Sequence, residues 1–383
     1  MMIDDKKLIR RRVADGFRVL VVVFALGFLP LGCESDQPIR IGLIANLTGR
    51  AADMGMSARN AVQMAVEQCN AQGGIHGRRV DLVVKDDRQK DETAVQAVRE
   101  LIAADVDVIV GPTTSSSAVA VVPYLNESGV FAVGPTVTTP ELSGRDDHFF
   151  RVCITARENA TFSARYQIRS GDMHRVAVAY DVGNRAFSEN FLEDFQKTFH
   201  AGGGRVLTAI DFIAEAGRSF SDIASGLLAA EPDGILIIAG PMDSALLCQQ
   251  IRKTAPAMKI TLSNWGASKR LLELGGTAVE GVTVPLAFDW DSPNPAYRTF
   301  ERAYFERYRR EPGFAGAYAY DAVQVVLSGL KARKSGQDLK ETLLSIGAFD
   351  GLQGKIRFDD FGDVVPSQVS IRIVRNRKFV VVD

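Results

Sequence analysis

Hydroxyl side chains are concentrated in Gly111-Pro112-Thr113-Thr114-Ser115-Ser116-Ser117, which follows an apolar run and opens a predicted helix. Backbone N–H groups at the start of a helix have no partner within the helix, and the helix dipole favours an anion there. The segment lacks the Gly-Lys-Ser/Thr ending of a nucleotide-binding loop. It therefore predicts a carboxylate site, with Thr114, Ser115 and Ser116 as binding residues. The alternative is that these hydroxyls only cap their own helix.

A second polar loop follows the next apolar run, in Gly134-Pro135-Thr136-Val137-Thr138-Thr139-Pro140-Glu141-Leu142. Its two prolines favour an extended course that leaves backbone N–H and carbonyl groups accessible. In an open parallel sheet, ligands bind beyond the carboxyl ends of the strands. We therefore expect Thr136 and Thr138 to face the same crevice as the Ser115 loop.

The elements that must position these loops alternate along the chain. Short β-branched runs predict strands at 39–45, 80–86, 106–110 and 130–134, with stretches of helical periodicity between them. The pattern begins again near residue 155, with predicted strands at 175–180, 205–212, 235–239 and 259–263. Such a series is typical of a parallel sheet, and its repetition in 383 residues predicts an α/β fold of two Rossmann-like, doubly wound lobes.

The N-terminus has a different character. Six basic residues between Lys6 and Arg18 precede an apolar run at 19–29. This layout is typical of a signal peptide, and the run is shorter than the roughly 20 apolar residues that a transmembrane helix needs. We expect 1–32 to target the chain for export and then to be removed.

The segment Leu29-Pro30-Leu31-Gly32-Cys33 resembles a bacterial lipobox, although Pro30 stands where leucine is usual. The resemblance implies that Cys33 is acylated and anchors the chain to a membrane, with 33–38 as a tether. The alternative is an ordinary secretory signal with an incidental cysteine.

Composition and spacing exclude several other functions. The 45 basic and 46 acidic residues leave a net charge of −1, so no general attraction to nucleic acid is expected. Cysteines and histidines are scattered without metal-ligand spacing, and no histidine lies near Ser115 to activate a nucleophile. We expect no metal, no cofactor and no enzymatic activity.

Several motifs resemble the leucine/isoleucine/valine-binding family of periplasmic binding proteins. They occur in the same order over 39–363, and they are Gly73-Gly74-Ile75-His76-Gly77, Asp86-Asp87, Gly111 to Ser117, Pro135 to Leu142 and Gly354-Lys355-Ile356-Arg357-Phe358-Asp359. The resemblance implies a type I fold with three crossovers between the lobes and hinge closure on a ligand. It also implies delivery of that ligand to an ABC permease in the inner membrane, from the periplasm or cell exterior.

The resemblance also suggests how the chain divides between the lobes. The expected division is 39–154 with 285–350 in the first lobe, and 155–284 with 351–383 in the second. The tail segments 354–360 and 368–383 alternate like antiparallel strands around a turn at Phe361-Gly362-Asp363.

Carried over by position, the resemblance places Ser115 and Thr138 at a ligand carboxylate and the Thr136 carbonyl at a ligand ammonium. Met54, Phe187 and Trp265 stand where the family has polar groups, and Trp265 replaces the acidic partner of the ammonium.

Trp265 is suited either to contact with the ligand's side chain or to packing between the lobes. Asp289 and Asp321 are the candidate substitutes for the missing acid. We therefore expect a small carboxylate ligand, an amino acid or a related compound. The competing hypothesis is a sensory module of the same fold that reports the ligand to a partner and feeds no permease.

Overall fold

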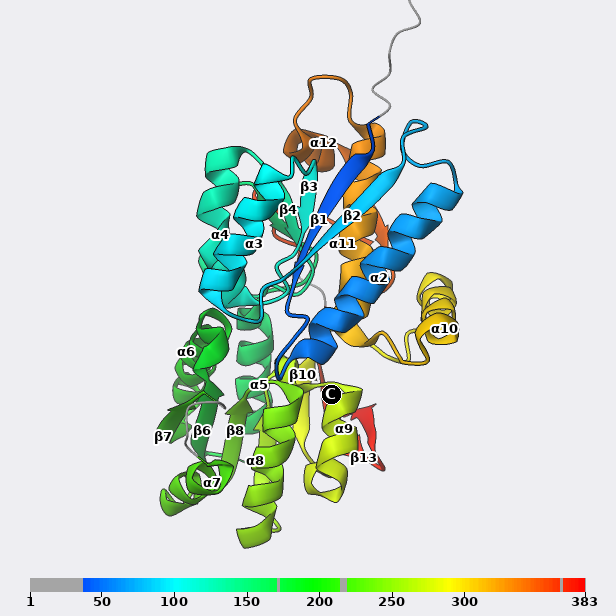
Figure 1. Cartoon of the computed structure of the whole chain (residues 1–383). Coiled ribbons are helices and arrows are strands. Elements are labelled where there is room, and N and C mark those ends of the chain that lie inside the picture. Colours follow the sequence, from blue (N-terminus) through cyan, green and yellow to red (C-terminus); the bar gives the residue numbers. More distant parts are fainter. Residues whose placement is uncertain (1–36, 171–172, 214–218, 366–367, 383) are drawn as a thin grey trace, which may run out of the picture. The chain divides into compact units, whose positions relative to one another are not determined.

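The computed structural model describes residues 37–170, 173–213, 219–365 and 368–382. The predicted signal peptide at 1–32 and the predicted acylation site Cys33 lie outside these residues. From Ile39 onward the described chain forms two α/β lobes, each built on its own sheet (Figure 1). No helix among the described residues is long and apolar enough to cross a membrane.

The sheet of the first lobe is parallel and has the strand order β2-β1-β3-β4-β5. Its strands are β1 (Ile39–Ala45), β2 (Val80–Asp86), β3 (Val108–Val110), β4 (Ala132–Gly134) and β5 (Phe149–Arg151). The short central strands are buried throughout, as expected for a parallel sheet that is covered on both faces. Their carboxyl ends carry the two polar loops that the sequence singled out.

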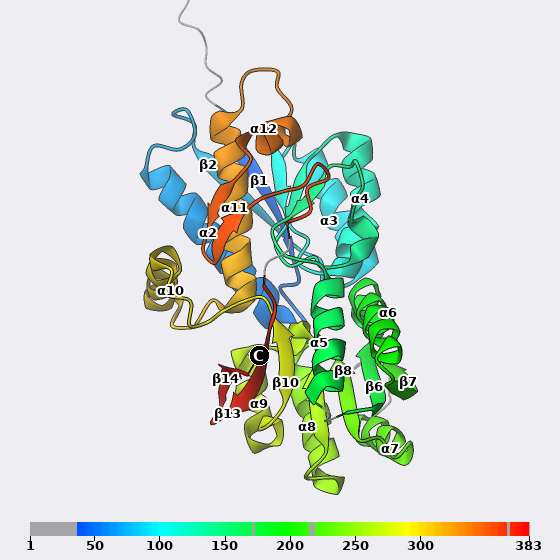
Figure 2. The same ribbon diagram turned by 180° about the vertical axis from the view of Figure 1, so that it is seen from behind.

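Helices cover both faces of this sheet (Figures 1 and 2). On one face lie α2 (Ala52–Ala71) and α11 (Gly313–Ala332), and on the other lie α3 (Asp91–Ala103) and α4 (Ser115–Ser128). The first face is completed by α10 (Pro295–Tyr308), α12 (Leu339–Ile346) and the hairpin of β11 (Phe349–Gly351) and β12 (Gly354–Ile356).

The second lobe is built on a mixed sheet with the order β14-β13-β10-β9-β8-β6-β7. Its parallel strands are β6 (Arg175–Asp181), β7 (Arg205–Phe212), β8 (Gly234–Ile238), β9 (Lys259–Leu262) and β10 (Thr283–Leu286). An antiparallel edge is added by β13 (Ser370–Arg375) and β14 (Lys378–Val381).

Two helices of the second lobe pack on one face of this sheet, α5 (Ala156–Ser170) and α6 (Arg185–Ala201). The other face is covered by α7 (Phe220–Ala229), α8 (Pro241–Thr254) and α9 (Lys269–Gly275). The two lobes therefore repeat one architecture, which confirms the predicted fold.

The chain passes between the lobes three times, after β5, after β10 and before β13. The third passage differs in position from the expected division at residue 350. Leu352, Ile356 and Phe358 pack in the core of the first lobe, whereas 370–381 joins the second sheet. The two tail segments do not pair with each other, because β12 pairs with β11 while β13 pairs with β10 and β14. Alternation alone did not distinguish one hairpin from strands in two lobes.

Candidate ligand-binding cleft

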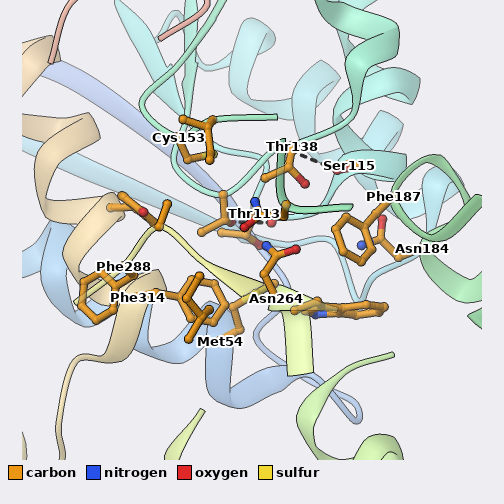
Figure 3. A pocket seen from close by; sticks show the side chains of 17 residues that line it. Met54, Thr113, Ser115, Thr138, Cys153, Asn184, Phe187, Asn264, Phe288 and Phe314 are labelled. Atoms are coloured by element: carbon orange, nitrogen blue, oxygen red, sulfur yellow. Dashed lines mark hydrogen bonds between the residues drawn. The ribbon is translucent and has the colours of Figure 1, made fainter. Parts of the chain in front are cut away.

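A cleft lies at the carboxyl ends of both sheets, with about 590 Å³ of empty space that includes its part open to solvent (Figure 3). Its lining residues come from both lobes and from the passages between them. They are Met54, Thr113, Ser115, Thr136, Thr138, Cys153, Ile154, Asn159, Asn184, Phe187, Asn264, Trp265, Leu286, Ala287, Phe288, Phe314 and Tyr318.

The first-lobe wall is a set of hydroxyl groups held by hydrogen bonds within that lobe. Thr113 Oγ1 donates to Asn46 Oδ1 over 2.7 Å, and Thr136 Oγ1 donates to the Thr113 carbonyl over 2.6 Å. The Thr138 N–H donates to Ser115 Oγ over 3.2 Å, as Figure 3 shows. Because Ser115 Oγ is the acceptor in that bond, its own hydrogen remains able to point to a ligand.

Gly111 sets the start of this wall. Its φ of +109° lies in a region that side chains rarely adopt, and a Cβ at this position would lie 2.2 Å from the Ile44 carbonyl oxygen. Only glycine allows β3 to turn this closely past β1. The turn brings Thr113 and Ser115 to the cleft at the first turn of α4.

The hydroxyls do not act as caps of α4. Thr114 is the N-cap residue by position, but its side chain makes no capping bond, and its Oγ1 donates instead to Ser117 Oγ over 2.9 Å. The Ser116 N–H donates to Asn184 Oδ1 of the second lobe over 3.1 Å, and Ser116 Oγ accepts from the Ala186 N–H over 3.1 Å. Neither Thr114 nor Ser116 lines the cleft. Thr114 is buried beneath it, and Ser116 joins the lobes.

The second-lobe wall is mainly aromatic. Phe187 and Trp265 pack edge to face, with ring centroids 5.5 Å apart. Met54 and Phe314 of the first lobe pack in the same apolar cluster, so the cleft is closed by side chains of both lobes. The Trp265 ring passes close to Gly240, where an added Cβ would lie 3.5 Å from it.

Three buried polar atoms along the cleft have no hydrogen-bond partner among the described residues. They are Asn159 Oδ1, Asn264 Oδ1 and Trp265 Nε1. Asn264 points toward Thr113 of the opposite wall (Figure 3). Leaving a buried donor or acceptor unpaired costs about 1–3 kcal/mol, so these atoms are candidates for contact with a ligand.

No charged side chain of the described chain lines the cleft. Neither proposed substitute for the missing acid reaches it. Asp321 Oδ1 accepts from the Leu352 N–H over 2.9 Å, and burial raises the pKa of Asp321 to about 7. Asp289 Oδ1 accepts from Arg372 Nη2 over 2.7 Å. Asp321 supports the β11–β12 hairpin of the first lobe and Asp289 the passage after β10, so neither is placed to pair with an ammonium group in the cleft.

Trp265 also lines a second, outer space of about 890 Å³, part of which is open to solvent. Across it, Arg50 of the first lobe pairs with Asp243 of the second, with Nε 2.8 Å from Oδ1. Asp181 also lines this space, and burial raises its pKa to about 6, with the nearby Asp243 charge adding to the rise. The charged contacts between the lobes therefore lie outside the cleft itself.

The structure brings most of the predicted binding residues together. Met54, Ser115, Thr136, Thr138, Phe187 and Trp265 all line the cleft, whereas Thr114 and Ser116 do not. Contact of the predicted binding residues with a ligand stays a prediction.

Sequence reasoning missed Thr113, Asn159, Asn184, Asn264 and Tyr318. Asn184 and Asn264 each follow the carboxyl end of a strand, so the rule that found Ser115 would have found them too. Asn159 and Tyr318 lie within helices and carried no such signal.

Comparison with known proteins agrees with this geometry. The periplasmic binding protein family model matches residues 38–370. The Leu/Ile/Val-binding protein BraC3 of Rhizobium johnstonii is 27% identical over 358 residues, which cover 91% of this chain and 94% of that protein.

Two solved structures show the same fold. A leucine-binding protein of Thermotoga maritima is 26% identical, with a TM-score of 0.80 over 90% of this chain and 98% of its own. A solute-binding protein of an ABC transporter from R. palustris, in complex with benzoate, is 18% identical, with a TM-score of 0.81 over 90% and 95% of the two chains.

The family resemblance, the type I fold and the expectation of a binding protein instead of an enzyme are thus confirmed. The chain belongs to the periplasmic binding protein family.

Proposed function

We propose that this protein is the extracytoplasmic substrate-binding component of an ABC transporter and that it captures a small carboxylate in the cleft. Family membership implies an exported protein. The observation that carries the proposal is the first-lobe wall, where Ser115 begins α4 and the Thr138 N–H of the next loop donates to Ser115 Oγ. The partial positive charge of a helix N-terminus favours an anion at this point.

The relatives support a carboxylate but differ in the remainder of the ligand. The BraC3 protein is named for leucine, isoleucine and valine, while the R. palustris structure holds benzoate. The fold therefore accommodates carboxylates both with and without an ammonium group. An amino acid or a related carboxylate is the ligand class common to these observations.

The carboxylate proposal is tested first with the ligand that the protein carries. Mass spectrometry of small molecules released from the denatured protein is expected to identify a carboxylic acid. Calorimetry should then compare that acid with its primary amide. A hydrogen bond to a charged group contributes roughly 1.5–3 kcal/mol, so we expect the amide to bind at least tenfold more weakly. Equal affinities of acid and amide would contradict the proposal.

We further propose that acylated Cys33 tethers the protein to the membrane beside its permease. The supporting features are the apolar run, Gly32 and the polar segment after Cys33. Cys33→Ser is expected to move the protein from the membrane fraction to the soluble extracytoplasmic fraction, with ligand affinity unchanged. An unchanged distribution would refute the anchor and leave the binding role intact.

A further inference from the structure

The unpaired polar atoms of the cleft bear on the part of the ligand that lies beyond its carboxylate. Asn159 is 2% exposed and Trp265 is 5% exposed, yet Asn159 Oδ1 and Trp265 Nε1 have no partner among the described residues. Asn264 Oδ1 is the third such atom. All three residues line the cleft, so a ligand is the natural source of the missing bonds.

The orientation of Asn159 is set by its own helix. Asn159 Nδ2 lies 3.5 Å from the Thr155 carbonyl, which accepts its hydrogen and leaves Oδ1 as the free atom. Asparagine Oδ1 can only accept, and the Trp265 indole N–H can only donate. The cleft therefore offers both hydrogen-bond acceptors and a donor to one ligand.

Charge decides which donor on the ligand is compatible with these acceptors. No described residue in the cleft wall is charged, and Asp289 and Asp321 are occupied elsewhere. A buried ammonium group would therefore meet only neutral oxygens, and no helix dipole would compensate its charge as the start of α4 compensates the carboxylate. A hydroxyl group carries no such requirement, and it both donates and accepts.

The remaining surface is apolar and largely aromatic, from Phe187, Trp265, Phe288, Phe314 and Leu286. This surface suits a flat or branched hydrocarbon body. Resting on the proposed function, we propose that the ligand is a hydroxylated monocarboxylate with an apolar body. Its hydroxyl donates to an asparagine Oδ1 and accepts from Trp265 Nε1, and it has no ammonium group.

The first test compares ligands that differ in one group. One series is leucine, 2-hydroxy-4-methylpentanoate and 4-methylpentanoate, which share a carbon skeleton and carry an ammonium, a hydroxyl or neither. The other is benzoate with 3-hydroxybenzoate and 4-hydroxybenzoate. By calorimetry, we expect a hydroxylated member to bind at least tenfold more tightly than its unhydroxylated partner, and the hydroxy acid to bind more tightly than leucine.

The second test removes the donor from the protein. Trp265→Phe keeps an aromatic ring but lacks Nε1–H, and it should reduce the preference for the hydroxylated acid to within about threefold. Affinity for the unhydroxylated acid is the reference, because both acids lose the same contacts with the larger indole ring. Trp290→Phe is the matched control, because Trp290 stacks on Phe379 and does not line the cleft. Asn159→Leu should act like Trp265→Phe, and it provides an independent variant if Trp265→Phe fails to fold.

The outcomes separate this inference from the proposed function. If carboxylates bind but hydroxylation gives no gain, or leucine binds more tightly than its hydroxy analogue, the inference is wrong and the carboxylate site stands. If Trp265→Phe and Trp290→Phe change the preference for the hydroxylated acid equally, the Trp265 indole N–H does not bind the ligand hydroxyl, and the inference is wrong. If none of the six acids binds while the denatured protein releases a carboxylic acid without a hydroxyl group, the inference is wrong and the carboxylate site stands.

Discussion

The two walls of the cleft differ in how their polar groups are held. In the first-lobe wall, Thr113, Thr136 and Ser115 all form hydrogen bonds within their own lobe. In the second-lobe wall, Asn264 and Trp265 carry polar atoms without a partner among the described residues. The first wall is held in place before any ligand arrives, with the Ser115 hydroxyl hydrogen left for a ligand, whereas polar atoms of the second wall stay unpaired until a ligand binds. This difference suggests that the first lobe binds the head group common to all ligands and the second lobe selects among them.

The largest effect is expected from breaking the first wall at its backbone. Gly111→Ala combines a strained φ of +109° with a contact of 2.2 Å to the Ile44 carbonyl. We expect it to lower the free energy of unfolding by about 3 kcal/mol in urea denaturation. Gly144→Ala is the control, since Gly144 has a φ of +66° and nothing within 4 Å of an added Cβ. Equal losses would show that the close approach at Gly111 is unimportant.

A smaller effect is expected from removing one hydroxyl of that wall. Ser115→Ala should weaken the binding of every carboxylate ligand by about tenfold to a hundredfold, because a bond to a charged group is lost. The order of preference among ligands should stay the same. Calorimetry on a ligand series tests both statements, and a change confined to one ligand would contradict the assignment of Ser115 to the common head group.

The opposite pattern is expected from the second wall. Trp265→Ala removes an aromatic surface and an N–H donor from the cleft. We expect relative affinities within a ligand series to change by about tenfold, with the ratio of acid to amide affinity preserved. A uniform loss across the series would mean that Trp265 serves lobe packing alone.

The smallest effect concerns Asp181, whose pKa is raised to about 6 by burial outside the cleft. Because the folded protein holds this proton more tightly than the unfolded chain does, ionisation destabilises the fold as pH rises from about 4 to 6. Asp181→Asn should therefore stabilise the protein at pH 7. We expect a gain of only about 1 kcal/mol, because the amide adds an N–H that needs a partner and this offsets part of the ionisation cost that is removed. The gain should fade as pH falls toward 4. Urea denaturation across this range would detect it, and a gain that persisted at pH 4 would exclude ionisation as its cause.

The sequence predicted the fold and the first wall better than the second. Strand alternation located both lobes, and the loops after β3 and β4 placed Ser115 and Thr138 where the structure has them. A residue directly after a strand is confined to the sheet edge, so its approximate position follows from the pattern. The roles of Asn159 and Tyr318 depend on how α5 and α11 are turned toward the cleft, which only tertiary packing sets.

Acidic residues show the same limit of sequence-based prediction, because their partners are also set by tertiary packing. Asp321 was a reasonable candidate by residue type, but its carboxylate accepts from Leu352 at the start of the β11–β12 turn. That hairpin could not be assigned to the first lobe by alternation, so the partner of Asp321 was not visible either. The displaced boundary in the tail and the unseen partner of Asp321 therefore had one origin.

The hydrogen bonds of Ser116 to Asn184 and Ala186 bear on how ligand-free and ligand-bound protein compete for the proposed permease. They are made by the protein alone, so they would favour the closure that the family resemblance implies whether or not a ligand is present. A closed, empty protein would compete with loaded ones for the proposed permease. The unpaired atoms Asn159 Oδ1 and Trp265 Nε1 would oppose closure without a ligand, because such closure leaves both atoms buried without a hydrogen-bond partner. The free-energy cost of these unpaired atoms would keep the population of closed, ligand-free protein at the permease low. A ligand that pairs them removes that cost.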